Sequence, residues 1–113
     1  MKRGPTEVDL LMLEQLEELS TAPWVFKEFR FCTTRQWRFD FAILDGHGAD
    51  FGIEIEGGVW VRGGGGHNRG KAFIDDMEKY NHAALLGWRV LRFTPQQVLK
   101  GEAIAFIRKV LES

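Results

Sequence analysis

Three carboxylates stand among strand-forming residues in the middle of the chain, and their spacing suggests chemistry. Asp40 lies in the segment 37–43, and Glu54 and Glu56 lie in the segment 51–56. Because successive side chains of a strand point to opposite faces, each segment is predicted to have one apolar face and one face that carries acids. Carboxylate oxygens are the ligands that Mg²⁺ and Mn²⁺ prefer, so the pattern predicts a divalent metal site.

A hairpin between the two segments would bring the acids together. One register pairs apolar residues with apolar residues and acid with acid throughout: Ile43 with Phe51, Phe41 with Ile53, Asp40 with Glu54, and Phe39 with Ile55. The alternation of side chains along segment 37–43 also predicts that Phe39 and Phe41 share one apolar face. Directly opposed carboxylates repel each other, so the register needs a cation between them. The alternative is a half-exposed hairpin whose acidic face is solvated.

Length and charge limit the class of protein. The chain has 113 residues, of which 44% are hydrophobic, which suits one domain with one core. No segment resembles a linker, a membrane span or a signal peptide, so we expect a cytoplasmic protein. The net charge of -1 argues against coating of nucleic acid through charge alone. Residues 57–71 nevertheless hold Arg62, Arg69 and Lys71 without any acid, which suits contact with a polyanion.

The elements that must position these residues are predicted in the order α-β-β-β-α-β-α. Thr6 and Asp9 form a capping-box-like pair at the start of a helix that ends near residue 20. Strand and helix patterns then follow in the segments 24–33 (strand), 37–43 and 51–56 (hairpin), 71–86 (helix) and 88–93 (strand). Thr94 caps a last helix that has a break near Gly101.

This order, with an Asp on the second strand and Glu-x-Glu on the third, resembles the PD-(D/E)XK nuclease superfamily, whose shared core is αβββαβ. Five pieces of the chain are most similar to its very-short-patch-repair-like endonucleases and related phage and prophage nucleases: RFDFA at 38–42, IEIEGG at 53–58, His67, EKYN at 78–81 and GWRVLRFT at 87–94. The resemblance covers roughly residues 10–98. It implies a single restriction-endonuclease-like α/β domain over residues 1–113, with a mixed sheet flanked by helices and a C-terminal helix.

The resemblance also implies a metal-dependent DNA endonuclease in which Asp40 and Glu54 bind Mg²⁺ or Mn²⁺ and the carbonyl of Ile55 is a further ligand. A bound divalent ion lowers the pKa of water and neutralises charge on phosphate, which phosphodiester hydrolysis requires. The third position of the motif is usually Lys, but here it is Glu56. Either Glu56 binds the metal or accepts the proton of the water, or a cation comes from elsewhere, the candidates being His67, Lys71 and Lys79.

Several other residues are candidates for the site. Glu17, with Glu14 as its rival, is the candidate for the acid that several superfamily members place on the first helix. His67 is also a candidate catalytic residue in a glycine-rich segment. The residues predicted to contact DNA are Arg38, Trp60, Arg62, Arg69, Lys71 and Lys79. A chain of this size has little surface for reading bases, so we expect a homodimer or a larger DNA-processing complex.

Two other functions fit parts of the sequence. The segment 65–72 has the spacing of a phosphate-binding P-loop, which would make the protein a nucleotide binder, but Ala72 stands where the Mg²⁺-binding Ser or Thr should be. A non-catalytic DNA-binding module with a degenerate nuclease site would follow if Glu56 marks lost activity. Cleavage of DNA with and without metal separates these functions from a nuclease.

Overall fold

The computed structural model describes residues 6–19, 24–44, 50–56 and 69–113. The elements follow one another as α1 (Glu7–Glu17), β1 (Trp24–Arg30), β2 (Arg38–Leu44), β3 (Asp50–Ile55), α2 (Arg69–Leu85), β4 (Trp88–Phe93), α3 (Pro95–Leu99) and α4 (Glu102–Glu112). The predicted order is confirmed, with the last helix divided into α3 and α4. In the part of the chain that is described, no helix is long and apolar enough to cross a membrane.

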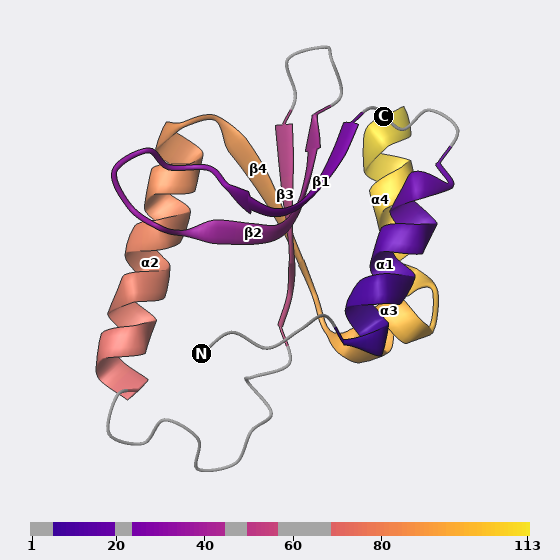
Figure 1. Ribbon diagram of the computed structural model, residues 1–113, viewed down its shortest axis with the longest axis horizontal. Helices are drawn as coiled ribbons and strands as arrows, with labels where there is room; N and C mark the ends of the chain where they lie inside the picture. Colours follow the sequence, from indigo (N-terminus) through magenta and orange to yellow (C-terminus); the bar gives the residue numbers. More distant parts are fainter. Residues whose placement is uncertain (1–5, 20–23, 45–49, 57–68) are drawn as a thin grey trace.

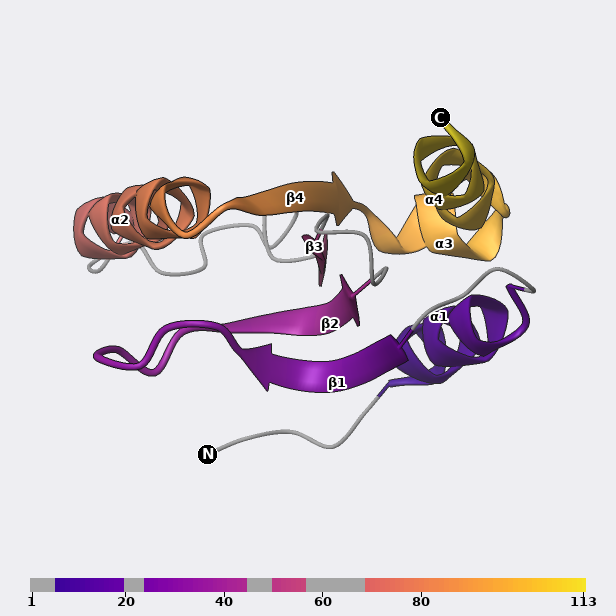
Figure 2. The same cartoon turned by 90° about the horizontal axis from the view of Figure 1, so that it is seen from above.

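The four strands form one mixed sheet in the order β1-β2-β3-β4. The first three strands pair antiparallel, and β4 pairs parallel to β3. A parallel pair needs a crossover connection, and α2 lies in that connection. In both ribbon views α2 lies on one side of the sheet and α1, α3 and α4 lie on the other (Figures 1 and 2). The chain is therefore a small α/β domain, as its sequence predicts.

Local hydrogen bonds explain where the helices begin. The hydroxyl of Thr6 accepts a hydrogen bond from the backbone N–H of Asp9, whose carboxylate accepts one from the N–H of Thr6. Thr94 and Gln97 form the same reciprocal pair at the start of α3. Each box satisfies backbone donors that the first turn of a helix leaves open. Gly101 has a φ of 80°, a conformation that favours glycine, and so separates α3 from α4.

The core is divided between the two faces of the sheet. The larger cluster joins the sheet to α1, α3 and α4, and its fully buried side chains include Met12, Leu16, Ile43, Ile53 and Ile107. The second cluster lies on the side of α2 and contains Phe31, Cys32, Phe39 and Ala83. Helix α2 contributes a single residue to it. The sheet is thus covered by three helices on one face and by one lightly packed helix on the other.

The prediction that Phe39 and Phe41 share one face is wrong. Phe41 belongs to the larger cluster and Phe39 to the second. The ring of Phe39 lies against Gly52, where a Cβ would be only 2.5 Å from Phe39 Cδ2. Gly52 lies between Phe51 and Ile53, which both face the larger cluster, so Phe39 lies on the opposite face. The alternation of β2 is therefore interrupted between Phe39 and Phe41, at Asp40.

Candidate active site

Strands β2 and β3 separate at the acidic residues. The predicted register is confirmed for Ile43 with Phe51 and Phe41 with Ile53, where the pairing ends. The predicted continuation, which pairs Asp40 with Glu54 and Phe39 with Ile55, is wrong. Instead the backbone N–H of Ile55 donates to Oδ2 of Asp40 at 2.7 Å. A carboxylate thus takes the place of a backbone acceptor, which keeps Asp40 from lying directly opposite Glu54.

Strand β1 is also irregular beside Asp40. Its register with β2 runs from Trp24 with Leu44 to Arg30 with Arg38 but skips the pair of Glu28 and Asp40. Glu28 has a φ of 49°, in the left-handed region that side chains rarely adopt. Such a conformation costs on the order of 1–3 kcal/mol and is often found at functional sites. Asp40 therefore lies between two interruptions of the sheet.

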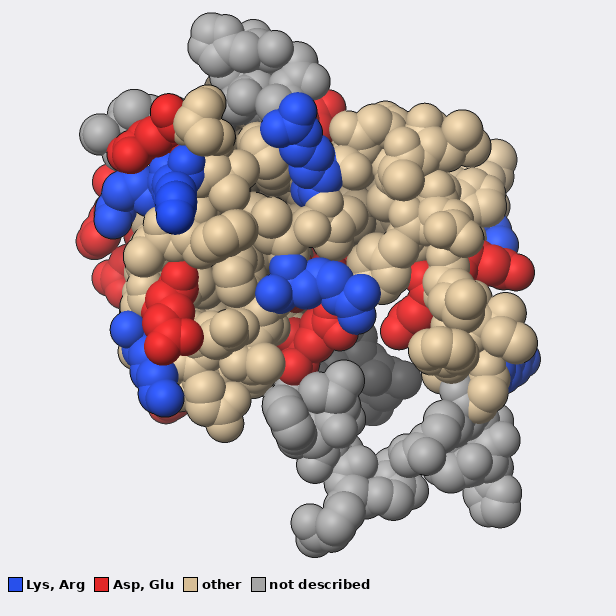
Figure 3. Space-filling model, turned by 180° about the vertical axis from the view of Figure 1, so that it is seen from behind, with Lys and Arg blue, Asp and Glu red and all other residues tan. Residues whose placement is uncertain are grey.

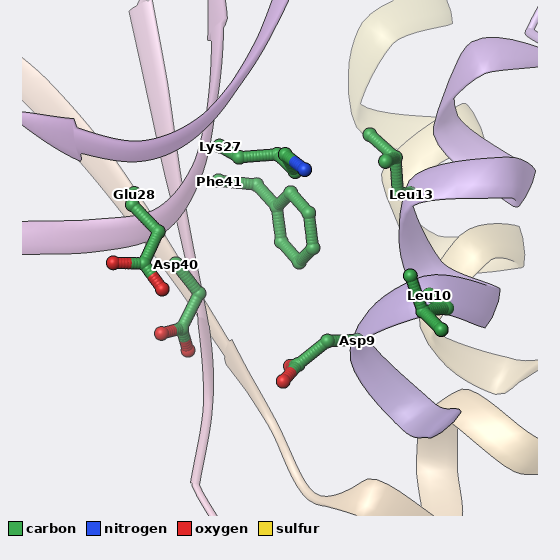
Figure 4. A pocket seen from close by; sticks show the side chains of 7 residues that line it. All are labelled: Asp9, Leu10, Leu13, Lys27, Glu28, Asp40 and Phe41. Carbon is green, nitrogen blue, oxygen red and sulfur yellow. The ribbon is translucent and has the colours of Figure 1, made fainter. Parts of the chain in front are cut away.

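Asp40 faces a pocket of about 320 Å³ between the sheet and α1. In the close-up, the carboxylates of Glu28 and Asp40 point the same way from neighbouring strands, and that of Asp9 points toward them from α1 (Figure 4). Burial raises the pKa of Asp40, the hydrogen bond from Ile55 opposes that shift, and the nearby charge of Asp9 adds to it. The residues that line the pocket include these three acids and one base, Lys27, so acids are in excess.

The acid that α1 contributes to the pocket is Asp9, not Glu17. Glu17 is exposed in the last turn of α1, eight residues further on, which is about 12 Å along a helix. Glu14 is exposed as well. The structure therefore supports neither predicted acid of the first helix. The sequence identifies Asp9 as a capping residue of α1. Its second role, at the pocket, depends on how α1 packs against the sheet, which the sequence pattern does not show.

Glu54 forms a hydrogen-bonded ion pair with Lys79 of α2. Lys79 Nζ lies 2.8 Å from Glu54 Oε2, and only 13% and 11% of the two side chains are exposed. Burial raises the pKa of Glu54 to about 7, although the hydrogen bond and charge of Lys79 lower it and the charges of Asp40 and Glu56 raise it. Lys79 thus supplies a cation at Glu54, and it is one of the three candidates that the sequence offered, of which His67 lies outside the described residues.

Glu56, the residue at the usual lysine position, is held by Arg92 of β4. Nε and Nη2 of Arg92 bond the two carboxylate oxygens, with Nη2 2.8 Å from Oε1. The guanidinium also lies over the ring of Tyr80, 4.5 Å from its centroid. Such a fork-shaped pair fixes both oxygens of the carboxylate. Both carboxylate oxygens of Glu56 are therefore engaged by Arg92.

The structure describes only part of the predicted DNA-binding set. Arg38 is exposed and pairs with Glu28 at 3.5 Å. Lys71 is exposed near the start of α2, and Arg69 is the first residue of that helix. The other predicted residues, Trp60, Arg62 and His67, lie outside the described residues, as does the glycine-rich part of the P-loop-like segment. Their roles stay predictions.

The donors at the acidic strands can be compared with those that divalent ions such as Mg²⁺ and Mn²⁺ prefer. Among the described residues no three His, Cys, Asp or Glu side chains form a metal site. The N–H of Ile55 donates to Oδ2 of Asp40, and Nζ of Lys79 donates to Oε2 of Glu54, so these two hydrogen bonds engage one oxygen of each carboxylate. The N–H and C=O of a residue in a regular strand point to the same side, so from the N–H contact we expect the carbonyl of Ile55 on the side of Asp40. Mg²⁺ is typically held by one or two carboxylates with waters and substrate phosphates, and this donor set fits it.

Comparisons of the chain with protein-family models, curated proteins and solved structures find no match.

Proposed function

We propose that the protein is a metal-dependent DNA endonuclease with a restriction-endonuclease-like fold, which hydrolyses phosphodiester bonds and leaves 5′-phosphate ends. The observation that carries the proposal is the enclosed ion pair of Glu54 and Lys79 beside Asp40, where β2 and β3 separate. The αβββαβ element order supports it. Two carboxylates can hold a divalent ion, and a lysine beside them can stabilise negative charge on a phosphate.

Asp40, Glu54 and the carbonyl of Ile55 would hold Mg²⁺ or Mn²⁺. The bound ion lowers the pKa of water and neutralises charge on the phosphate. Asp40 and Glu54 must both be ionised to bind it, and burial raises both of their pKa values, so binding releases protons. The hydrogen bond from Ile55 fixes the orientation of the Asp40 carboxylate and so preorganises the site.

Lys79 would take the cationic role that the third motif position usually gives to a lysine. Its ammonium already lies at hydrogen-bond distance from Glu54 and is held there by α2. From this position it can donate to a water or to a phosphate oxygen as negative charge develops. Glu56 would act indirectly, by fixing Arg92 at the same end of β3 and β4.

Cleavage assays test the proposal. Linear, nicked, mismatched and four-way-junction DNA are incubated with Mg²⁺, with Mn²⁺ and with chelator. We expect cleavage of at least one substrate that depends on metal, loss of about 10²-fold or more in rate for Lys79→Ala, and an unchanged rate for Lys109→Ala, an exposed lysine on α4. DNA binding that is equal in chelator, without cleavage of any substrate, would instead identify a non-catalytic binding module.

A further inference from the structure

Helix α2 carries an uncharged stripe on its solvent side. The stripe residues recur at helical spacing and fall within about 120° of a helical wheel: Phe73, Ile74, Met77, Asn81, Ala84 and Leu85. All six are exposed, and the exposed fractions of Phe73, Ile74, Met77 and Leu85 are 64%, 58%, 51% and 77%. In the view from behind, a broad area without Lys, Arg, Asp or Glu covers the later turns of α2 and the start of β4, and charged side chains border it nearer the start of the helix (Figure 3).

The stripe does not hold α2 to its own sheet. The contacts between α2 and the sheet include Ala83, which is fully buried in the second cluster, Lys79, which bonds Glu54, and Tyr80, over whose ring Arg92 of β4 lies. Ala83 and Lys79 lie on the other side of the helical wheel from the stripe, and Tyr80 lies at its edge. A helix at the surface of a globular protein normally turns its apolar stripe toward the core. Because this stripe is exposed to solvent, we expect another molecule to cover it.

The spacing of the stripe is symmetric about position 79. Residues 73 and 85, 74 and 84, and 77 and 81 are equally distant from it. When two such helices pack antiparallel about a two-fold axis, Ile74 of one copy faces the small Ala84 of the other. In the same arrangement Met77 faces Asn81, and no charged residue faces another across the stripe. The stripe is thus self-complementary, as an interface with two-fold symmetry requires.

The exposed area is also sufficient for association. The four large apolar side chains together expose on the order of 500 Å² per copy, more than half of the roughly 800 Å² per partner that a standard interface buries. We infer that a second copy of this chain packs on the stripe, α2 against α2, to form an antiparallel two-fold dimer. The dimer does not depend on the nuclease activity, and either can be present without the other.

Sedimentation equilibrium of the full chain between about 1 and 100 µM tests the dimer. Wild type is expected to have twice the mass of the chain, and Met77→Glu is expected to associate at least about 100-fold more weakly, since the dimer would bury an unpaired charge. Leu99→Glu is the matched control, because Leu99 on α3 is 61% exposed and lies outside the stripe. Circular dichroism shows whether each variant remains folded.

A monomeric wild type, as expected if a different protein covers the stripe, would overturn the inference. So would a folded Met77→Glu variant that remains a dimer. The antiparallel register has its own test, since Phe73→Lys and Leu85→Glu should each weaken association while the double variant restores part of it by placing opposite charges together. A double variant weaker than both single variants would contradict that register.

Discussion

Lys79 on α2 and Glu54 on β3 are hydrogen-bonded at 2.8 Å with little of either side chain exposed. Because α2 lies in the connection between β3 and β4, this pair ties the crossover helix to the strand that it follows. Two enclosed charges stabilise a fold only while both are present, since either one alone is left without a counter-ion. The stability of the protein in the absence of metal is therefore expected to depend on this contact.

Removal of the ammonium should destabilise the protein. Lys79→Met leaves the carboxylate of Glu54 enclosed without its partner, and the free energy of unfolding at pH 8 in chelator is expected to fall on the order of 3 kcal/mol. Urea denaturation measures the change. Lys109→Met, at an exposed position, should change it by less than about 0.5 kcal/mol. Replacing both partners, with Lys79→Met and Glu54→Leu together, should recover most of the lost stability. If the double variant is as unstable as Lys79→Met, the loss does not come from the unpaired carboxylate of Glu54.

Stability in chelator should decrease as pH rises. The pKa of Glu54 is about 7 in the folded chain against an ordinary value of 4.5, so between these values the folded state retains a proton that the unfolded state has released. Unfolding then becomes easier with rising pH, by a total of roughly 3 kcal/mol between about pH 4.5 and 7. Asp40, whose pKa is also raised, contributes in the same direction. Denaturation curves at several pH values should show the decrease in wild type and a smaller one in Glu54→Gln.

Metal binding should require Asp40 and release protons. Calorimetry with Mn²⁺ near pH 6.5 is expected to show one or two sites, with a heat that depends on the ionisation enthalpy of the buffer because Glu54 must lose its proton. Asp40→Asn should weaken binding sharply, whereas Glu102→Gln, at an exposed acid on α4, should not. Equal affinity in wild type and Asp40→Asn would rule out the proposed ligand set.

Glu56 and Lys79 should differ in their effect on cleavage. Glu56→Gln leaves the half-exposed Arg92 with a neutral partner, so we expect a change in rate of about tenfold or less, against about 10²-fold or more for Lys79→Ala. Single-turnover kinetics at saturating DNA and metal would measure both rates. If Glu56→Gln abolishes cleavage while Lys79→Ala retains it, the third motif position acts directly and Lys79 is only structural.

Local features of this fold could be predicted from the sequence. The reciprocal caps of Thr6 with Asp9 and of Thr94 with Gln97 depend on residues three apart, so the sequence pattern is sufficient. The register near the turn of the hairpin follows from alternating apolar residues, which permit only one good match. These features are determined by neighbours along the chain.

The arrangement of the candidate site could not be predicted in the same way. The alternation rule assumes an unbroken strand, and it failed at Phe39 because β2 is interrupted at Asp40. Glu54 and Lys79 are 25 residues apart, and their contact depends on how α2 crosses the sheet. Asp9 reaches the pocket only because α1 packs with its first turn beside β2. Tertiary packing determines each of these placements.

The exposure of α2 has a consequence for its local stability. Residues 70–78 are all exposed, whereas Lys79, Tyr80, His82 and Ala83 are buried or half-buried. In a single copy the first turns of the helix can therefore open without disturbing the contact with β3, and their amide hydrogens should exchange with solvent much faster than those after residue 82. Slow exchange at 74–78 in solution would mean that something covers these turns. The exchange pattern of one helix thus reports directly whether its outer surface is occupied.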